Sequence, residues 1–360
     1  MTTNNKQYMD WSKRIPELTE KADNGDREAI NILHDLYYNE KDQHQQFNDE
    51  LMAIYNKGAD ENKPYSLYQL AIVYLNGCSK DKDMDKGINY LTKSMNVGCS
   101  QAYVCMAILN KLGVVNNGDY DTMLKKAMDM DNSNAYLLAA LDLMDGNDDG
   151  DCESDDSDSD DDSDNNSKDQ GEQIVKYLEK SIEFGNTNAI HQLGQYYHDL
   201  GKFDLATQYY LEGCERNNEH CFFNLAVMYR EGEGVGKNIK KSLELFQKAI
   251  DLGSIKALTC IGSIYAEQHD YENAKKYYRQ AVDKDDPLAC FVLGKLYMIQ
   301  KKYKEAIKIF IKGATLDEPK CMHKLFEYGI DMDATDENIN GVIQMHKTFS
   351  NFGAYDGFYH

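Results

Sequence analysis

Small residues recur along this chain at positions that align into nine repeats. Ala, Ser or Cys opens each repeat, and apolar residues at helical spacing follow in two successive stretches. This pattern predicts two helices per repeat joined by a turn. The opening residues are Ala29, Ser66, Ala102, Ala135, Ala189, Cys221, Ala257, Ala289 and Cys321.

Two further positions of the repeat also carry small residues, and each lies at a fixed distance from an opening residue. Five residues after the opening, the internal repeats carry only Ala or Gly: Ala71, Ala107, Ala140, Gly194, Ala226, Gly262 and Gly294. His34 and Phe326 take this position in the outermost repeats, which each lack a neighbour. Eight residues before an opening stand Gly58, Ser94, Ala127, Ser181, Gly213, Ala249, Ala281 and Gly313. The connection between repeats therefore has a fixed length, and length variation falls in the turn inside each pair. We predict an all-α solenoid of eight to nine helix–turn–helix repeats.

An acidic stretch, GDCESDDSDSDDDSDNNSKD at residues 150–169, interrupts this pattern. Asp145 to Glu172 includes 14 acidic residues and one Lys, a composition typical of disorder. The small positions keep their register on both sides, so we interpret the stretch as an enlarged turn inside the fourth repeat. Ser157 and Ser159 each have Asp three residues later, as acidophilic kinases prefer, and are predicted phosphorylation sites. The stretch either solubilises the chain or competes with an acidic partner for the cations of the C-terminal half.

Two motifs point to a known superfamily. The residues Leu193, Gly194, Tyr197, Ala206 and Tyr210 resemble the L-G-x-x-Y…A-x-x-x-F signature of the tetratricopeptide repeat. Residues 225–253 resemble the related Sel1-like repeat, with its Gly-rich turn at Gly232, Gly234 and Gly236, and residues 70–99 resemble it more weakly. The resemblance covers roughly residues 25–330. It implies a right-handed α/α superhelix that presents protein-binding surfaces, and it implies no chemistry.

Composition narrows the class of partner. The chain of 360 residues has a formal net charge of −22, which argues against nucleic acid and against anionic membrane surfaces. The N-terminus lacks the apolar run of a signal peptide, and no apolar stretch is long enough to span a membrane. Nine Cys without a CxxC pair predict reduced thiols. We expect a cytoplasmic protein, with a nuclear location as the alternative, and the oligomeric state stays open.

The sequence contains no residue pattern typical of a reaction centre. His191 and His198 lie seven residues apart, whereas metal ligands on one helix prefer three or four. The cysteines of the first helices fit small core positions better than a nucleophile that needs a base. The glycines at 232, 234 and 236 follow no strand and precede no Gly-Lys-Ser/Thr, so a turn explains them better than a phosphate loop. We expect no enzyme activity, no metal and no cofactor; a hydrolase with an unrecognised site on the repeat array is an alternative.

In this superfamily the first helices line the concave face. Apolar side chains take the inward positions of the N-terminal half: Tyr65, Tyr68, Val104, Ile108, Leu137, Leu141 and Met144. Polar and basic side chains take those of the C-terminal half: His191, Gln195, Asn224, Arg230, Lys256, Lys295, Lys320 and Lys324. The predicted peptide-binding residues are His191, Gln195, Asn224, Arg230, Lys256, Lys295, Lys324, Tyr68 and Leu141. The alternative is that these are ordinary solvated or packed side chains.

A comparison with carboxylate-clamp tetratricopeptide domains raises a further alternative. Their clamp positions correspond here to His191, Gln195, Asn224, Lys256 and Cys260, so the clamp Arg is missing. We predict a non-catalytic protein-interaction scaffold or adaptor that binds peptide or helical segments of protein partners in this groove. The alternative partner is the acidic C-terminal peptide that a co-chaperone adaptor recognises.

The predicted organisation has five parts. Residues 1–24 form an N-terminal capping helix and 25–145 the first block of repeats. The disordered acidic loop occupies 146–172. The second block of repeats follows at 173–330, and 331–360 form a C-terminal capping segment.

Overall fold

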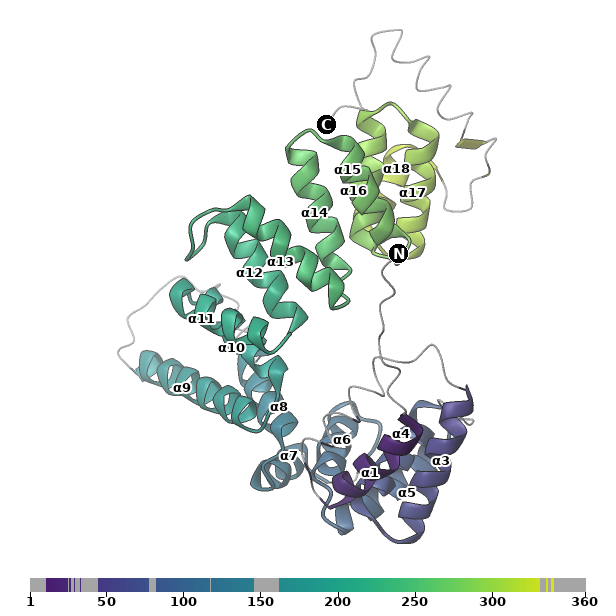
Figure 1. Ribbon diagram of the computed structural model, residues 1–360, viewed down its shortest axis with the longest axis vertical. Coiled ribbons are helices and arrows are strands. Elements are labelled where there is room, and N and C mark those ends of the chain that lie inside the picture. Colours follow the sequence, from purple (N-terminus) through teal and green to yellow (C-terminus); the bar gives the residue numbers. More distant parts are fainter. Residues whose placement is uncertain are drawn as a thin grey trace. The chain divides into compact units, whose positions relative to one another are not determined.

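The computed structural model describes residues 11–24, 26, 29, 33, 45–77, 82–116, 118–145, 162–330, 335, 338 and 339. These residues form 17 helices and no strand (Figure 1). The chain divides into two compact units, Met1–Ala189 and Ile190–His360. The predicted all-α solenoid fold is confirmed, because consecutive helices pack as pairs within each unit.

The N-terminal unit is built from three complete helix pairs and the helices that precede them. Its helices are α1 (Trp11–Asp23), α3 (Gln45–Asp60), α4 (Pro64–Asn76), α5 (Met84–Asn96), α6 (Ser100–Lys111), α7 (Tyr120–Asp129), α8 (Ser133–Asp145) and α9 (Asp162–Glu183). The pairs α4–α5, α6–α7 and α8–α9 pack closely, and α3–α4, α5–α6 and α7–α8 join successive repeats. At the start of the unit, the Asp23 carboxylate of α1 accepts hydrogen bonds from the Ser66 backbone nitrogen (2.9 Å) and hydroxyl (2.8 Å).

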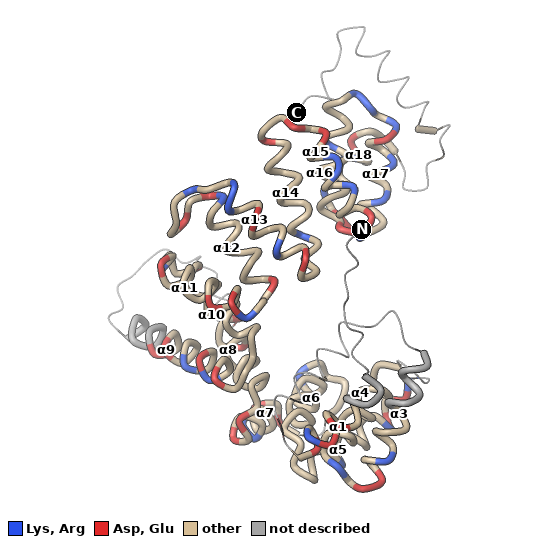
Figure 2. The backbone as a smooth tube through the Cα atoms, viewed as in Figure 1, with Lys and Arg blue, Asp and Glu red and all other residues tan. Residues whose placement is uncertain are grey.

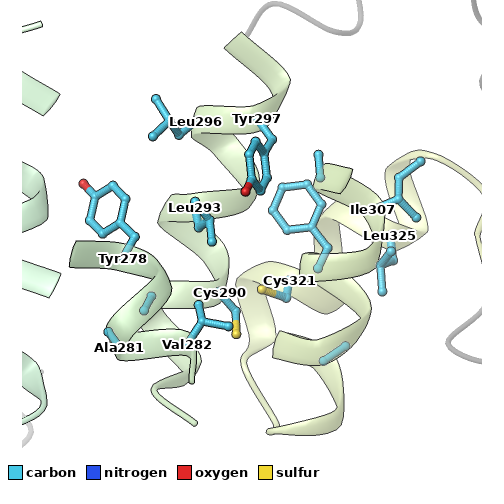
Figure 3. Close-up of a cluster of buried hydrophobic side chains, with 14 of the residues drawn as sticks. Tyr278, Ala281, Val282, Cys290, Leu293, Leu296, Tyr297, Ile307, Cys321 and Leu325 are labelled. Atoms are coloured by element: carbon cyan, nitrogen blue, oxygen red, sulfur yellow. The ribbon is translucent and has the colours of Figure 1, made fainter. Parts of the chain in front are cut away.

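The C-terminal unit continues the same arrangement. Its helices are α10 (Thr187–Asp199), α11 (Phe203–Glu215), α12 (Glu219–Glu231), α13 (Ile239–Asp251), α14 (Lys256–Glu267), α15 (Tyr271–Val282), α16 (Pro287–Ile299), α17 (Tyr303–Thr315) and α18 (Pro319–Glu327). The unit boundary falls inside α10, not at the acidic stretch. The pairs α12–α13, α14–α15 and α16–α17 pack closely. The core of the last repeats brings Tyr278, Leu293 and Leu325 into one buried cluster (Figure 3).

The small positions found in the sequence are buried. All nine opening residues are at most 2% exposed. The eight residues that precede the openings by eight positions are buried as well. Phe326, the outermost exception, is 84% exposed, and His34 lies outside the described residues. The register of small residues therefore marks the places where helices approach most closely.

One backbone motif explains the constant connection between repeats. Four residues after the small residue of each second helix, the chain adopts a positive φ, in the left-handed range. The next residue donates its N–H back to the carbonyl of the small residue, as Asn132 does to Ala127 (3.0 Å) and Asp286 to Ala281 (3.0 Å). This is the Schellman ending of a helix. It occurs in all eight connections, at residues 62, 98, 131, 185, 217, 253, 285 and 317.

A second regularity couples the two helices of a repeat. In three repeats the residue at the second small position is Gly, and a Cβ placed there would overlap an aromatic ring of the second helix. The pairs are Gly194–Tyr210, Gly262–Tyr278 and Gly294–Phe310. Ala71 instead shares its buried cluster with the smaller Leu91. Ala226 shares its cluster with Phe246, in the repeat with the longer Gly-rich turn.

The predicted acidic loop, residues 146–172, overlaps a helix at its C-terminal end. Helix α8 continues to Asp145, and α9 starts at Asp162, so residues 162–172 belong to a helix and not to the predicted loop. A helix can extend beyond its packed face because each added residue contributes one further backbone hydrogen bond. Residues 146–161, including Ser157 and Ser159, and most of the predicted C-terminal cap lie outside the described residues.

Candidate partner-binding surfaces

A pocket of about 510 Å³ lies among the first helices of the N-terminal unit. Tyr68 of α4, Ile108 of α6 and Leu137 of α8 line it, together with the connection before α10. Four other inward positions were predicted for this half. Tyr65 and Val104 also line the pocket, whereas Leu141 and Met144 are half-buried on α8 outside the lining. The first helices thus supply the apolar part of the pocket lining.

The polar wall of this pocket comes from the connections between repeats, which the sequence analysis did not consider. The Asn132 amide donates to the Ser100 hydroxyl (3.0 Å), and its oxygen accepts from the Ala135 backbone nitrogen (3.1 Å). The Asn186 amide donates to Asn134 Oδ1 (2.8 Å) across the next connection. These carboxamides therefore already hold successive repeats together.

Charge is scarce in the pocket. Of its 21 lining residues, all within the described part of the chain, Asp131 alone has an ionisable carboxylate or a basic group. At the far end of α6, Lys111 and the Tyr120 hydroxyl both contact the Asp142 carboxylate, which links α6, α7 and α8. A ligand in this pocket would meet an almost uncharged surface.

In the C-terminal unit, three predicted peptide-binding residues come together. The Asn224 side-chain nitrogen lies 3.0 Å from His191 Nε2 and 3.3 Å from Gln195 Oε1. The Tyr210 hydroxyl lies 3.2 Å from the same nitrogen. Helices α10, α11 and α12 therefore present one hydrogen-bonded cluster, made of His191, Gln195, Asn224 and Tyr210, which we call the polar cluster.

Burial keeps the histidine of the polar cluster neutral. The pKa of His191 is lowered to about 4, first because burial disfavours the charged ring and second because His220 is near. The two imidazole centroids are 5.1 Å apart. His191 therefore accepts a hydrogen bond from Asn224 at neutral pH and contributes no positive charge to the surface.

The predicted cations of this unit differ in how they are held. Arg230 contacts the Glu267 carboxylate and lies 3.3 Å from Glu231. Lys324 pairs with Glu327 at 2.6 Å. Lys295 and Lys320 lie over the ring of Phe291, at 5.5 and 5.7 Å, while Lys256 is exposed at the start of α14. Figure 2 shows basic and acidic residues interspersed along this unit, so it is not a uniform basic groove.

The described thiols are poor nucleophiles. Burial raises the pKa of Cys105, Cys260 and Cys290 to about 11, and that of Cys214 and Cys321 to about 12. A thiolate is the reactive form of cysteine, so these residues are held in their unreactive form. No group of three or more His, Cys, Asp or Glu in the described ranges could hold a metal ion. None of the described helices combines the length and the apolar character that crossing a membrane requires.

Comparisons with known proteins agree with this architecture. The Sel1 repeat family matches residues 64–96 and 223–254, and the tetratricopeptide repeat family matches residues 187–220, 255–284 and 288–320. The crystal structure of a Sel1 repeat protein from Oxalobacter formigenes is 17% identical, with a TM-score of 0.51 over 75% of this chain and 99% of that one.

Two further solved structures show the same fold. A protective antigen of uropathogenic Escherichia coli that displays an SLR fold is 18% identical, with a TM-score of 0.50 over 96% of this chain and 73% of that one. Yeast Tom70 is 14% identical, with a TM-score of 0.53 over 97% of this chain and 68% of that one. At these identities the likeness concerns the fold alone.

Helix pairs, registered small residues and Schellman connections define the class, an α-helical repeat protein of the tetratricopeptide superfamily. Within that class, the chain combines Sel1 repeats with tetratricopeptide repeats.

Proposed function

We propose that this chain is a non-catalytic scaffold or adaptor that binds peptide or helical segments of partner proteins along its first helices. Sel1 and tetratricopeptide repeats are generally protein-interaction scaffolds. Two surfaces are available for partners: the pocket of the N-terminal unit, and the polar cluster with Lys256 in the C-terminal unit.

The pocket is the observation that best supports the proposal. Binding sites are concave and mostly apolar, with a few polar groups, and about 510 Å³ is within the range of such sites. Ile108 and Met130, both on its lining, are each 38% exposed. Exposed apolar residues around a hollow are typical of a surface that a partner covers.

The hydrolase alternative has weaker support. A nucleophilic cysteine requires a lowered pKa, and the described thiols with resolved shifts all have raised values. His191, whose pKa is lowered the most among the described histidines, accepts a hydrogen bond from Asn224 and not from a hydroxyl or thiol nucleophile.

Affinity capture on the full chain, followed by quantitative mass spectrometry, tests the proposal. Cell extract from the organism that makes the protein would be passed over wild type and four single variants. Ile108→Lys alters the pocket, and Lys256→Glu alters the exposed start of α14. Leu211→Lys (residue 44% exposed) and Lys240→Glu are matched controls on the second helices α11 and α13.

We expect partners to be lost with Ile108→Lys or Lys256→Glu and kept with both controls. Partners that bind all five proteins equally would contradict the proposal. So would saturable turnover of a generic ester, amide or lactam that a point substitution abolishes. Binding of a synthetic acidic C-terminal peptide, lost with Lys256→Glu, would favour the co-chaperone adaptor over other scaffolds.

A further inference from the structure

The floor of the N-terminal pocket is one stripe of helix α6. Gln101, Val104, Cys105, Ile108 and Leu109 all line the pocket, and their spacing of three and four places them on a single helical face. Leu112, one turn beyond Ile108, is 69% exposed and continues the apolar stripe toward solvent. The apolar surface thus extends beyond the hollow itself.

Two carboxamides on the walls of the pocket, those of Asn132 and Asn186, are already engaged and offer few hydrogen bonds to an extended ligand. An extended peptide needs partners for its backbone N–H and C=O groups when it is buried. Asn132 and Asn186 already use both ends of their amides, since Asn186 Oδ1 also accepts from the Asn188 backbone nitrogen at 3.0 Å. Gln101 Oε1 accepts from the Ser100 hydroxyl at 3.4 Å. A helical ligand satisfies its own backbone and does not need these groups.

The charge of the pocket restricts the ligand further. Away from Asp131, the only charged residue among those that line the pocket, a charged side chain of the ligand would lose its hydration without gaining an opposite charge. The face of the ligand that enters must therefore be uncharged and apolar, while its opposite face stays in water.

We propose that the pocket formed by α4, α6 and α8 binds the apolar face of an amphipathic helix from a partner protein. This inference rests on the proposed scaffold function and specifies its ligand in the N-terminal unit. The helix places apolar residues spaced i, i+3 or i+4, and i+7 against Ile108, Leu137 and Tyr68. It needs neither an acidic terminus nor a free carboxylate, so it differs in chemistry from a ligand of the polar cluster.

A displayed library of random peptides of about 16 residues, selected on the immobilised full chain, tests this inference. Eluted peptides would be sequenced, and their binding measured by fluorescence anisotropy. Circular dichroism difference spectra would report their helicity when bound. We expect enriched apolar residues at spacings of three and four, a gain of helical signal on binding, and loss of binding when proline replaces a central residue of the peptide.

Pocket variants locate the site. Ile108→Lys and, as a second variant outside the helix interior, Met130→Lys should each weaken binding about ten-fold or more, while Leu211→Lys leaves it unchanged. Thermal melts of all variants exclude unfolding as the cause.

Several results would overturn the inference. One is enrichment with a period of two, which indicates an extended ligand. Others are indifference to both pocket variants, or no selected peptide at all. If Lys256→Glu still abolishes capture of cellular partners in that case, the scaffold function stands and only the assignment of the pocket fails.

Discussion

The contact between Gly294 and Phe310 allows a quantitative test of why the second small position is Gly in some repeats and Ala in others. A Cβ on Gly294 would lie 2.6 Å from Cδ1 and 2.7 Å from Cζ of Phe310, and closest to Cε1. The Phe310 ring is fully buried and cannot swing into solvent. In the N-terminal unit the corresponding Ala71 packs in one cluster with Leu91, a smaller partner. We therefore expect Gly294→Ala to be tolerated only if Phe310 becomes smaller.

The sizes of two opposing effects decide whether Gly294→Ala stabilises or destabilises the protein. Replacing Gly by Ala inside a helix stabilises it by about 1 kcal/mol, whereas overpacking a core costs about 1–3 kcal/mol. Because three atoms of a buried ring are too close, we expect the upper part of that range and a net loss of about 1–2 kcal/mol. Phe310→Leu leaves a cavity and should cost about 1–2 kcal/mol by itself. The double variant should be more stable than the sum of the single effects by about 1–2 kcal/mol.

Native-state hydrogen exchange of α16 and α17 is the appropriate assay, because repeat arrays unfold in parts and a single global transition is not assured. The wild type, both single variants and the double variant complete the cycle. Additive effects, or a Gly294→Ala variant more stable than wild type, would refute the volume argument.

Three further outcomes are expected. The pKa of His191 is lowered to about 4 from an ordinary 6.5, so below pH 6.5 only the unfolded state gains a proton. The free energy of unfolding should therefore fall by about 3 kcal/mol as the pH drops from 6.5 to 4. Urea titrations across this pH range should show a smaller fall for His191→Gln than for the wild type. Equal falls would contradict the assignment of this pH dependence to His191. Asp23→Ala removes two hydrogen bonds to Ser66 and should lower the free energy of unfolding of the N-terminal unit by about 1–3 kcal/mol. Thermal denaturation would detect this loss, and an unchanged melting midpoint would refute it. In a variant that lacks Cys78 and Cys152, a thiol reagent at neutral pH should label the four buried cysteines, Cys99, Cys221, Cys290 and Cys321, rapidly only after denaturation. Rapid labelling of these four in the native protein would contradict their burial.

The helix pairs could be predicted from the sequence because small residues recur at a fixed spacing wherever helices approach closely. It also predicted the eight-residue connection, but not its cause. In these eight connections the left-handed residue is Gly, Asn or Asp, as Gly98, Asn62 and Asp131 illustrate. The identity of that residue therefore gave no recognisable motif, although the hydrogen bonds are the same in all eight connections.

The candidate surfaces were less accessible to sequence reasoning. Repeat register correctly placed Ile108 and Leu137 on one face, because it follows helix geometry. It could not show that Asn132 and Asn186 form a wall, since these residues lie in connections. It also treated Arg230 as a groove cation, whereas Glu267 of the next first helix neutralises it. Such ion pairs depend on how side chains of neighbouring repeats are oriented, and the sequence alone does not show this orientation.

Hydrogen exchange of the full chain, free and bound to a captured partner, would show directly whether partners bind along the first helices. We expect binding to slow exchange in the first helices, above all in α6 and α8 or in α10, α12 and α14. The second helices α5, α7, α11 and α13 should exchange as before. Protection confined to the second helices, or no protection at saturating partner, would contradict a scaffold that binds through its first helices.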